Sequence, residues 1–170
     1  MRWFDRAFPA DLPSWMFPNI VERLRGTPAR LEELLRSVPT SVITRRWNDS
    51  WSIQENAGHL LDLEGLWMSR FRDLQVGNAQ LTEADLRNRQ TWERNHNDAS
   101  LAEILRSFRS AREELVAQLN RVDEAMMERT AIHPRLGNPM RLVDLAFFVA
   151  EHDDHHLARV TQLKHIFAQS

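Results

Sequence analysis

Hydrophobic residues recur at helical spacing along most of the chain, most clearly near its end. Steps of three and four residues from that region meet Leu145, Phe148, Val149, His152, His156, Val160, Leu163 and Phe167. This is the apolar stripe of a helix that packs against a core. We expect a helix from about Arg141 to Phe167, with two histidines interrupting its buried face.

The same spacing predicts an earlier helix from Pro18. Ile20 and Leu24 begin its apolar face. Thr27 and Pro28 resemble an N-cap followed by a proline at the first helical position. We therefore expect one long helix that is broken or kinked near Gly26 and closes before residue 39.

Two capping boxes mark the starts of two further helices. Ser52 and Glu55 form the first, and Ser100 and Glu103 form the second. The apolar stripes that follow are Ile53, Ala57, Leu60, Leu63, Trp67, Phe71 and Leu74, and Leu101, Ile104, Leu105, Phe108, Leu115 and Leu119. Gly77 offers a left-handed stop for the first of these helices, and Arg112 is expected to face solvent in the second.

The remaining segments have no clear helical period. Residues 1–17 read as an irregular arm that covers part of the core or a partner. Residues 78–99 form a long polar connection of the kind that is often functional, for example as a lid. Residues 132–139 form a proline-rich crossing. Because no strand pattern is present, we predict an all-α four-helix bundle, with residues 18–170 as a single domain.

Composition narrows the functions that this chain can have. Its 170 residues carry a formal net charge of −2, and no basic segment with interleaved aromatics indicates a nucleic-acid partner. No apolar run is long enough for a membrane span, and the first residues lack the apolar core of a signal peptide, so a cytoplasmic location is expected. Since cysteine is absent, a bound metal must use His, Asp, Glu or water.

The histidine pair on the last helix is the main candidate for chemistry. His152 and His156 are four residues apart and so share one helical face. His59 lies at the border of the second predicted helix's apolar face. Three histidines that leave an open position are typical of catalytic zinc sites, and imidazole also suits nickel and iron. The alternative is that ordinary hydrogen bonds satisfy each ring in the core.

Neighbouring polar residues are expected in lesser roles. His155 should sit at the rim of such a site. The nearby carboxylates should orient ligands or face solvent; they are Glu151, Asp153 and Asp154. The other histidines should be structural or exposed; they are His96, His133 and His165.

Larger side chains are expected to form the walls of the core or of a pocket. The tryptophans in this role are Trp47, Trp51, Trp67 and Trp92. Arg135 and Arg141 could frame the mouth of the site together with the 78–99 loop.

Two segments, residues 51–60 and 148–157, resemble the DinB-like superfamily, which includes YfiT-type metal-dependent hydrolases. The likeness spans roughly residues 18–168, and His59, His152 and His156 match the family's histidine pattern. The resemblance implies an up-down-down-up, left-handed four-helix bundle, frequently a homodimer. It also implies a divalent metal in a pocket, zinc or nickel first and iron or manganese as alternatives. Relatives include transferases and isomerases that depend on low-molecular-weight thiols.

Two hypotheses for function follow. The first is a metal-dependent hydrolase or thiol-dependent transferase acting on a small molecule, whose thiol would come from an external cofactor. Glu55 is a weak candidate for an acid or base, with its capping box as the competing explanation. The second is a non-enzymatic, dimeric stress-associated or ligand-binding bundle with a structural or vestigial metal site. A third possibility, that the N-terminal arm of residues 1–17 pairs two copies of the chain, is compatible with either hypothesis. A fourth protein ligand would favour the second hypothesis, and an open position facing a pocket would favour the first.

Overall fold

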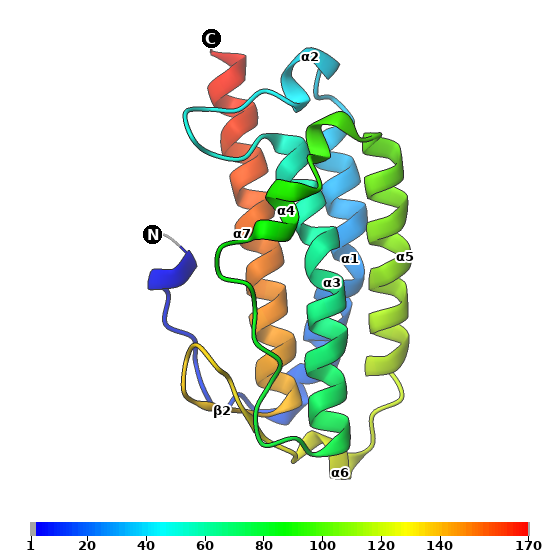
Figure 1. The fold of residues 1–170 in the computed structure, drawn as a ribbon. Helices are drawn as coiled ribbons and strands as arrows, with labels where there is room; N and C mark the ends of the chain where they lie inside the picture. Colours follow the sequence, from blue (N-terminus) through cyan, green and yellow to red (C-terminus); the bar gives the residue numbers. More distant parts are fainter. Residues whose placement is uncertain (1–2, 170) are drawn as a thin grey trace.

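Four long helices form the molecule in a computed structural model that describes residues 3–169 (Figure 1). They are α1 (Phe17–Leu35), α3 (Ile53–Val76), α5 (Leu101–Leu119) and α7 (Leu142–Ala168). Helices α1 and α7 run in one direction and α3 and α5 in the other, which is the up-down-down-up order. Both α1 and α3 pack against α5 and α7. The prediction of a four-helix bundle is confirmed.

The connection between α3 and α5 is long because these two consecutive helices run in the same direction. The chain leaves α3 at Gly77, whose φ of 78° is left-handed, and returns along the bundle (Figure 1). The polar stretch contains the short helices α4 (Arg89–Glu93) and η3 (His96–Asp98). It is thus partly helical, and His96 and Thr91 are buried within it.

In the described part of the chain, six short elements lie outside the four long helices and this connection. They are η1 (Trp3–Asp5), η2 (Ser14–Met16), α2 (Thr40–Ile43), α6 (Glu124–Met127), β1 (Ala131–Ile132) and β2 (Pro139–Met140). The expectation of no strands was wrong for the crossing segment, where β1 and β2 pair antiparallel. Pairs of two-residue strands are too short to show an alternating pattern. The turn between them carries His133 and Arg135.

Helix α1 is continuous, so the predicted break at Gly26 and the N-cap at Thr27 were wrong. Pro28 lies inside the helix and lacks the N–H that would bond to the carbonyl of Leu24. That carbonyl instead accepts a hydrogen bond from Arg112 Nη1 at 3.2 Å. The second capping box was also wrong, because the Ser100 side chain makes no cap hydrogen bond.

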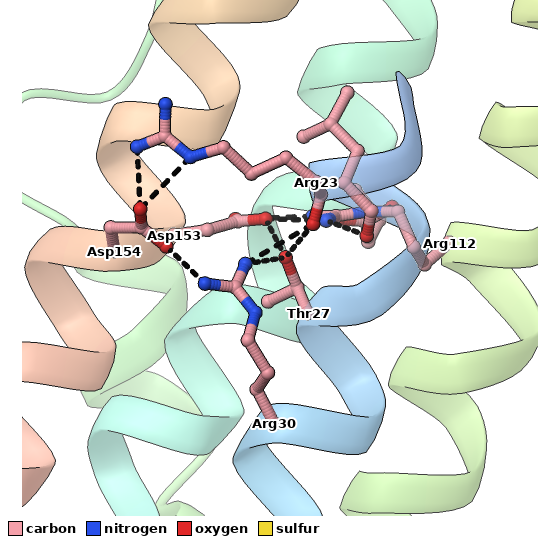
Figure 2. Close-up of polar contacts among 8 residues, drawn as sticks. Arg23, Thr27, Arg30, Arg112, Asp153 and Asp154 are labelled. Carbon is pink, nitrogen blue, oxygen red and sulfur yellow. Dashed lines mark hydrogen bonds and ion pairs between the residues drawn. The ribbon is translucent and has the colours of Figure 1, made fainter. Parts of the chain in front are cut away.

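Arg112 is buried, contrary to the expectation that it faces solvent. Its guanidinium contacts Glu64 of α3, with Nη2 at 2.6 Å from Oε1, and Asp153 of α7. Thr27 of α1 donates to the same aspartate at 2.8 Å. Figure 2 shows this network beside the more exposed ion pairs of Asp154. The four long helices therefore meet at one buried ionic cluster.

Two apolar clusters divide the core along the bundle. On α7 the first cluster ends at Ala150 and the second begins at Leu157. The polar residues 151–156 lie between them, so the histidines occupy the middle of the molecule. The N-terminal arm packs against this region, with the Trp3 ring centroid 5.0 Å from that of His152. Within residues 3–169, no helix has both the length and the hydrophobicity to cross a membrane.

Candidate metal centre

His59, His152 and His156 meet between α3 and α7. One ligand-capable atom from each lies within 4.8 Å of the others, and all three side chains are buried. Their ring centroids are 4.6 to 5.3 Å apart. Residues almost a hundred positions apart in the sequence thus come together because α3 and α7 pack side by side.

The start of α3 fixes the position of His59. Ser52 accepts a hydrogen bond from the Glu55 N–H at 3.0 Å, and the Glu55 carboxylate accepts from the Ser52 N–H at 2.8 Å. This capping box begins the helix two turns before His59. Glu55 also pairs with Arg46, so its contacts are those of a structural carboxylate.

The tautomer of His59 follows from its hydrogen-bond partners. Thr91 donates its hydroxyl hydrogen to Asp62 Oδ2 at 2.8 Å, so its oxygen accepts from His59 Nδ1 at 2.9 Å. His96 Nε2 and Arg94 Nη1 lie 2.9 and 3.2 Å from the two oxygens of the same aspartate. His59 therefore carries its proton on Nδ1, and its Nε2 keeps a free lone pair.

The other two histidines differ in how they are held. Asn56 donates its amide to the Ser52 carbonyl at 2.7 Å, so its Oδ1 accepts from His156 Nδ1 at 2.9 Å. The Nε2 of His156 is then also free to act as a ligand. His152 Nδ1 is buried without a hydrogen-bond partner among the described residues. Leaving such an atom unsatisfied costs about 1 to 3 kcal/mol.

Burial keeps these imidazoles neutral. It lowers the pKa of His59 to about 4, against a smaller opposing effect of Asp62. The pKa values of His152 and His156 lie well below the ordinary value, because burial and the neighbouring histidines disfavour a positive charge. Neutral imidazole is the form that binds a metal ion.

A cavity of about 690 Å³ opens beside the three histidines, which belong to its lining. Its wall mixes polar side chains with aromatic ones, among them Trp3, Trp51, Trp67 and Phe148. Its volume is that of a small-molecule site. Among described residues, no fourth His, Asp or Glu joins the histidine group.

The structure also places the neighbouring residues named in the sequence analysis. His155 is half-buried, 3.2 Å from Arg6 Nη2, and outside the histidine group. The nearby carboxylates do not orient the histidines: Asp153 pairs with Arg112, and Glu151 and Asp154 pair with Arg23.

The cavity wall matches the expectation in part. Arg135 lines the cavity, whereas Arg141 caps α7 outside it. Trp51 and Trp67 line it, whereas Trp47 and Trp92 are largely exposed. His96 and His133 are buried, and His165 is exposed, as expected for structural or solvent-facing residues.

Sequence reasoning missed the groups that orient the rings, Asn56 and Thr91. Asn56 precedes His59 by three residues on α3, which is a signal for a contact near the same face. Thr91 lies in the long connection, where no periodic pattern indicates its direction.

Comparison with known proteins places the chain in a family. The DinB superfamily matches residues 23–160. The chain belongs to the DinB superfamily. No curated protein matches the chain in a comparison of sequences.

Two solved structures share the fold of this chain. YfiT from Bacillus subtilis, described as a probable metal-dependent hydrolase with an unusual four-helix bundle topology, aligns with a TM-score of 0.80 and 18% identity over 96% of this chain and 94% of its own. A mycothiol-dependent maleylpyruvate isomerase aligns with a TM-score of 0.68 and 10% identity over 93% of this chain and 62% of its own. At these identities the likeness shows the fold.

Proposed function

We propose that this DinB-superfamily protein is a metal-dependent enzyme, a hydrolase or a thiol-dependent transferase, with a site formed by His59, His152 and His156. The main support for this proposal is that three neutral, buried imidazoles converge on the wall of a cavity. A divalent cation held there would supply a Lewis acid that lowers the pKa of a bound water or small thiol.

The donor set fits such an ion. Hydrogen bonds at Nδ1 leave Nε2 free on His59 and His156, and His152 has no competing partner among the described residues. Ligand atoms about 2.1 Å from a tetrahedral ion lie roughly 3.4 Å apart. The ligand-capable atoms of the three rings lie within 4.8 Å of one another, so the rings would draw closer around an ion. Zinc or nickel suits imidazole, with iron or manganese as alternatives.

The chain's own residues have defined tasks in this proposal. Thr91 and Asn56 hold two rings at fixed orientation and tautomer, as partners of metal-binding histidines commonly do. The aromatic wall excludes water from the reacting group and packs against apolar parts of a substrate. Because the chain has no cysteine, a reacting thiol has to come from a small external cofactor. Glu55 remains a weak acid or base candidate, since it is engaged by Arg46.

An open face of the histidine group favours an enzyme over a structural metal site. A structural site is commonly closed by a fourth protein ligand, and the described residues provide none here. The name of the mycothiol-dependent isomerase supports a thiol-dependent reaction, and that of YfiT supports hydrolysis. The non-enzymatic, ligand-binding bundle is the competing proposal, and it predicts metal retention without turnover.

Metal content tests the site directly. We expect about one divalent ion per chain in the purified protein, measured by mass spectrometry of the elements, and loss of that ion in the alanine variants of His59, His152 and His156. His165→Ala is the matched control, because this exposed histidine lies on α7 away from the cavity. Unchanged metal content in all three variants would eliminate the site.

Thr91→Val tests how the ring of His59 is held. The valine keeps the shape but cannot accept from Nδ1, so metal affinity should fall about 10- to 100-fold. Thr161→Val is the control, because within residues 3–169 that hydroxyl donates to the Leu157 carbonyl of its own helix and has no other hydrogen bond. Competition with a chelating dye measures both. Equal affinities in the two variants would remove Thr91 from the site.

We further propose a homodimer. Its support is the exposed aromatic side chains of Phe4 and Trp15 on the arm. Light scattering of the full chain gives the mass, and alanine at both aromatic positions tests the arm. A dimer that persists in that variant would place the interface elsewhere.

A further inference from the structure

Arg70, His133 and Arg135 form a second group of polar side chains in the cavity wall. Arg70 and His133 are buried, and Arg135 is partly buried. Arg70 lies three turns beyond His59 on α3, and the other two lie on the turn between β1 and β2. The Trp67 ring separates this group from the histidines: its centroid is 5.5 Å from that of His152 and 5.6 Å from the Arg70 guanidinium carbon.

Among the described residues, no carboxylate forms an ion pair with the positive charges of this group. No ion pair joins Arg70 or Arg135 to an acid within residues 3–169, although Asp73 lies close enough to influence Arg70. Arg70 instead donates to the Thr82 carbonyl at 2.9 Å. Arg135 Nη2 is buried and makes no hydrogen bond in the described chain. Unpaired buried charge is costly, so such arginines ordinarily have an anionic partner.

Hydrogen-bond donors also outnumber acceptors around His133. Its Nδ1 is 3.2 Å from the backbone N–H groups of Arg135 and Leu136, and its Nε2 is 3.1 Å from Arg70 Nη1. A neutral imidazole can accept at only one of its two nitrogens, and arginine never accepts. In either tautomer, one of these contacts places two hydrogen-bond donors opposite each other. The group therefore has fewer hydrogen-bond acceptors than donors.

Burial and the two arginines make protonation of His133 unfavourable. They lower its pKa to about 4. Burial, with the charge of Arg135, also lowers the pKa of Arg70 to about 10. At neutral pH the group therefore holds two cations and a neutral imidazole. The acids in the cavity lining, Glu83 and Asp85, lie on the exposed connection, and Asp85 already pairs with Arg89.

We propose that Arg70, His133 and Arg135 bind an oxyanion of the substrate, a carboxylate or phosphate, while the rest of the molecule extends past Trp67 toward the three histidines. An oxyanion supplies the missing acceptor lone pairs and the missing negative charge together, and arginine binds such groups with two parallel hydrogen bonds. This inference deepens the proposed function, since it treats the cavity as the substrate site. The substrate class is then a small anionic molecule with an apolar body.

The test measures anion binding with the histidine site removed, so that binding to a metal ion cannot imitate it. The probes are 3-phenylpropanoate, its neutral amide, and inorganic phosphate, titrated calorimetrically at pH 7 into metal-free protein and into His59→Ala. We expect the carboxylate to bind at least about tenfold more tightly than the amide in both proteins, because hydrogen bonds to a charged group are stronger than those to a neutral one. Binding of phosphate alone would assign the site to phosphorylated substrates.

Variants then locate the anion. Arg135→Gln, and Arg70→Gln if it folds, should each weaken carboxylate binding at least about tenfold and leave amide binding unchanged. Arg159→Gln is the charge-matched control, because Arg159 lines the same cavity on α7 beyond His156. Equal binding of acid and amide would overturn the proposal, as would an equal loss in the control. Neither result would affect metal content, so failure here is distinguishable from failure of the metal site.

Discussion

Gly58 permits a close contact between α3 and the long connection, and its replacement gives a sharp test of the fold around His59. A Cβ at this position would lie 2.5 Å from His96 Nδ1 and closer still to two carbons of that ring. Since real contacts of a Cβ are not shorter than 3.0 Å, the imidazole would have to move. It would then lose its hydrogen bond to the buried Asp62, now 2.9 Å.

Three effects decide the sign for Gly58→Ala. The higher helix propensity of alanine gains about 1 kcal/mol. Overpacking costs about 1 to 3 kcal/mol, and loss of a charged hydrogen bond costs about 1.5 to 3 kcal/mol. We expect a net loss of about 1.5 to 5 kcal/mol. For a domain of this size that lowers Tm by roughly 3 to 20 °C.

Gly65→Ala is the matched control on the same helix. Nothing lies within 4 Å of a Cβ added there, so only the propensity gain applies, and Tm should rise by about 2 to 4 °C. Thermal unfolding followed by circular dichroism measures both. In a His96→Ala background the cost of Gly58→Ala should disappear. The reasoning is refuted if the two glycine variants shift Tm in the same direction.

Two further predictions concern buried charge. Arg112→Met should destabilise the protein by about 3 to 5 kcal/mol in urea unfolding, because it leaves Glu64 and Asp153 unpaired. Arg109→Met breaks an exposed pair with Glu32 and should cost at most about 1 kcal/mol. Similar losses in the two variants would contradict the burial of the cluster. Metal-free protein should lose stability between pH 6.5 and 4, because buried histidines with pKa lowered to about 4 take up protons only on unfolding. Glu64, with its pKa raised to about 6, has the opposite effect on stability, because it binds a proton more readily in the folded protein. It is a single group against several histidines. A Tm that stays constant between pH 6.5 and 4 would exclude neutral buried histidines.

The helices were predictable because each has an amphipathic period, and α3 also has a correct local start signal. Ser52 and Glu55 show this best, since both halves of their capping box are formed. Pro28 misled the prediction for a physical reason: proline breaks a helix through its missing N–H, but a cation from another helix can satisfy the carbonyl that is left. That cation comes from a residue distant in sequence, which local patterns do not describe.

Part of the candidate site was also predictable. Spacing on α7 placed His152 and His156 on one face, and His59 stood at the border of the apolar face of α3. The family resemblance matched all three, and the structure brings them together. Their orienting partners were not predictable, because Thr91 reaches the site from a connection with no periodicity. Arg112 was misplaced because its neighbours Glu113 and Glu114 are typical of a solvated face, while the carboxylates that bury it lie on other helices.

Pro28 and Arg112 are joined through one carbonyl oxygen, that of Leu24. A residue with an N–H at position 28 would offer that oxygen a partner within the helix, so that the oxygen would no longer depend on the guanidinium. A redesigned bundle that replaces the ionic cluster with hydrophobic side chains therefore has to change position 28 together with 64, 112 and 153. Among natural relatives, we expect these positions to vary as a set.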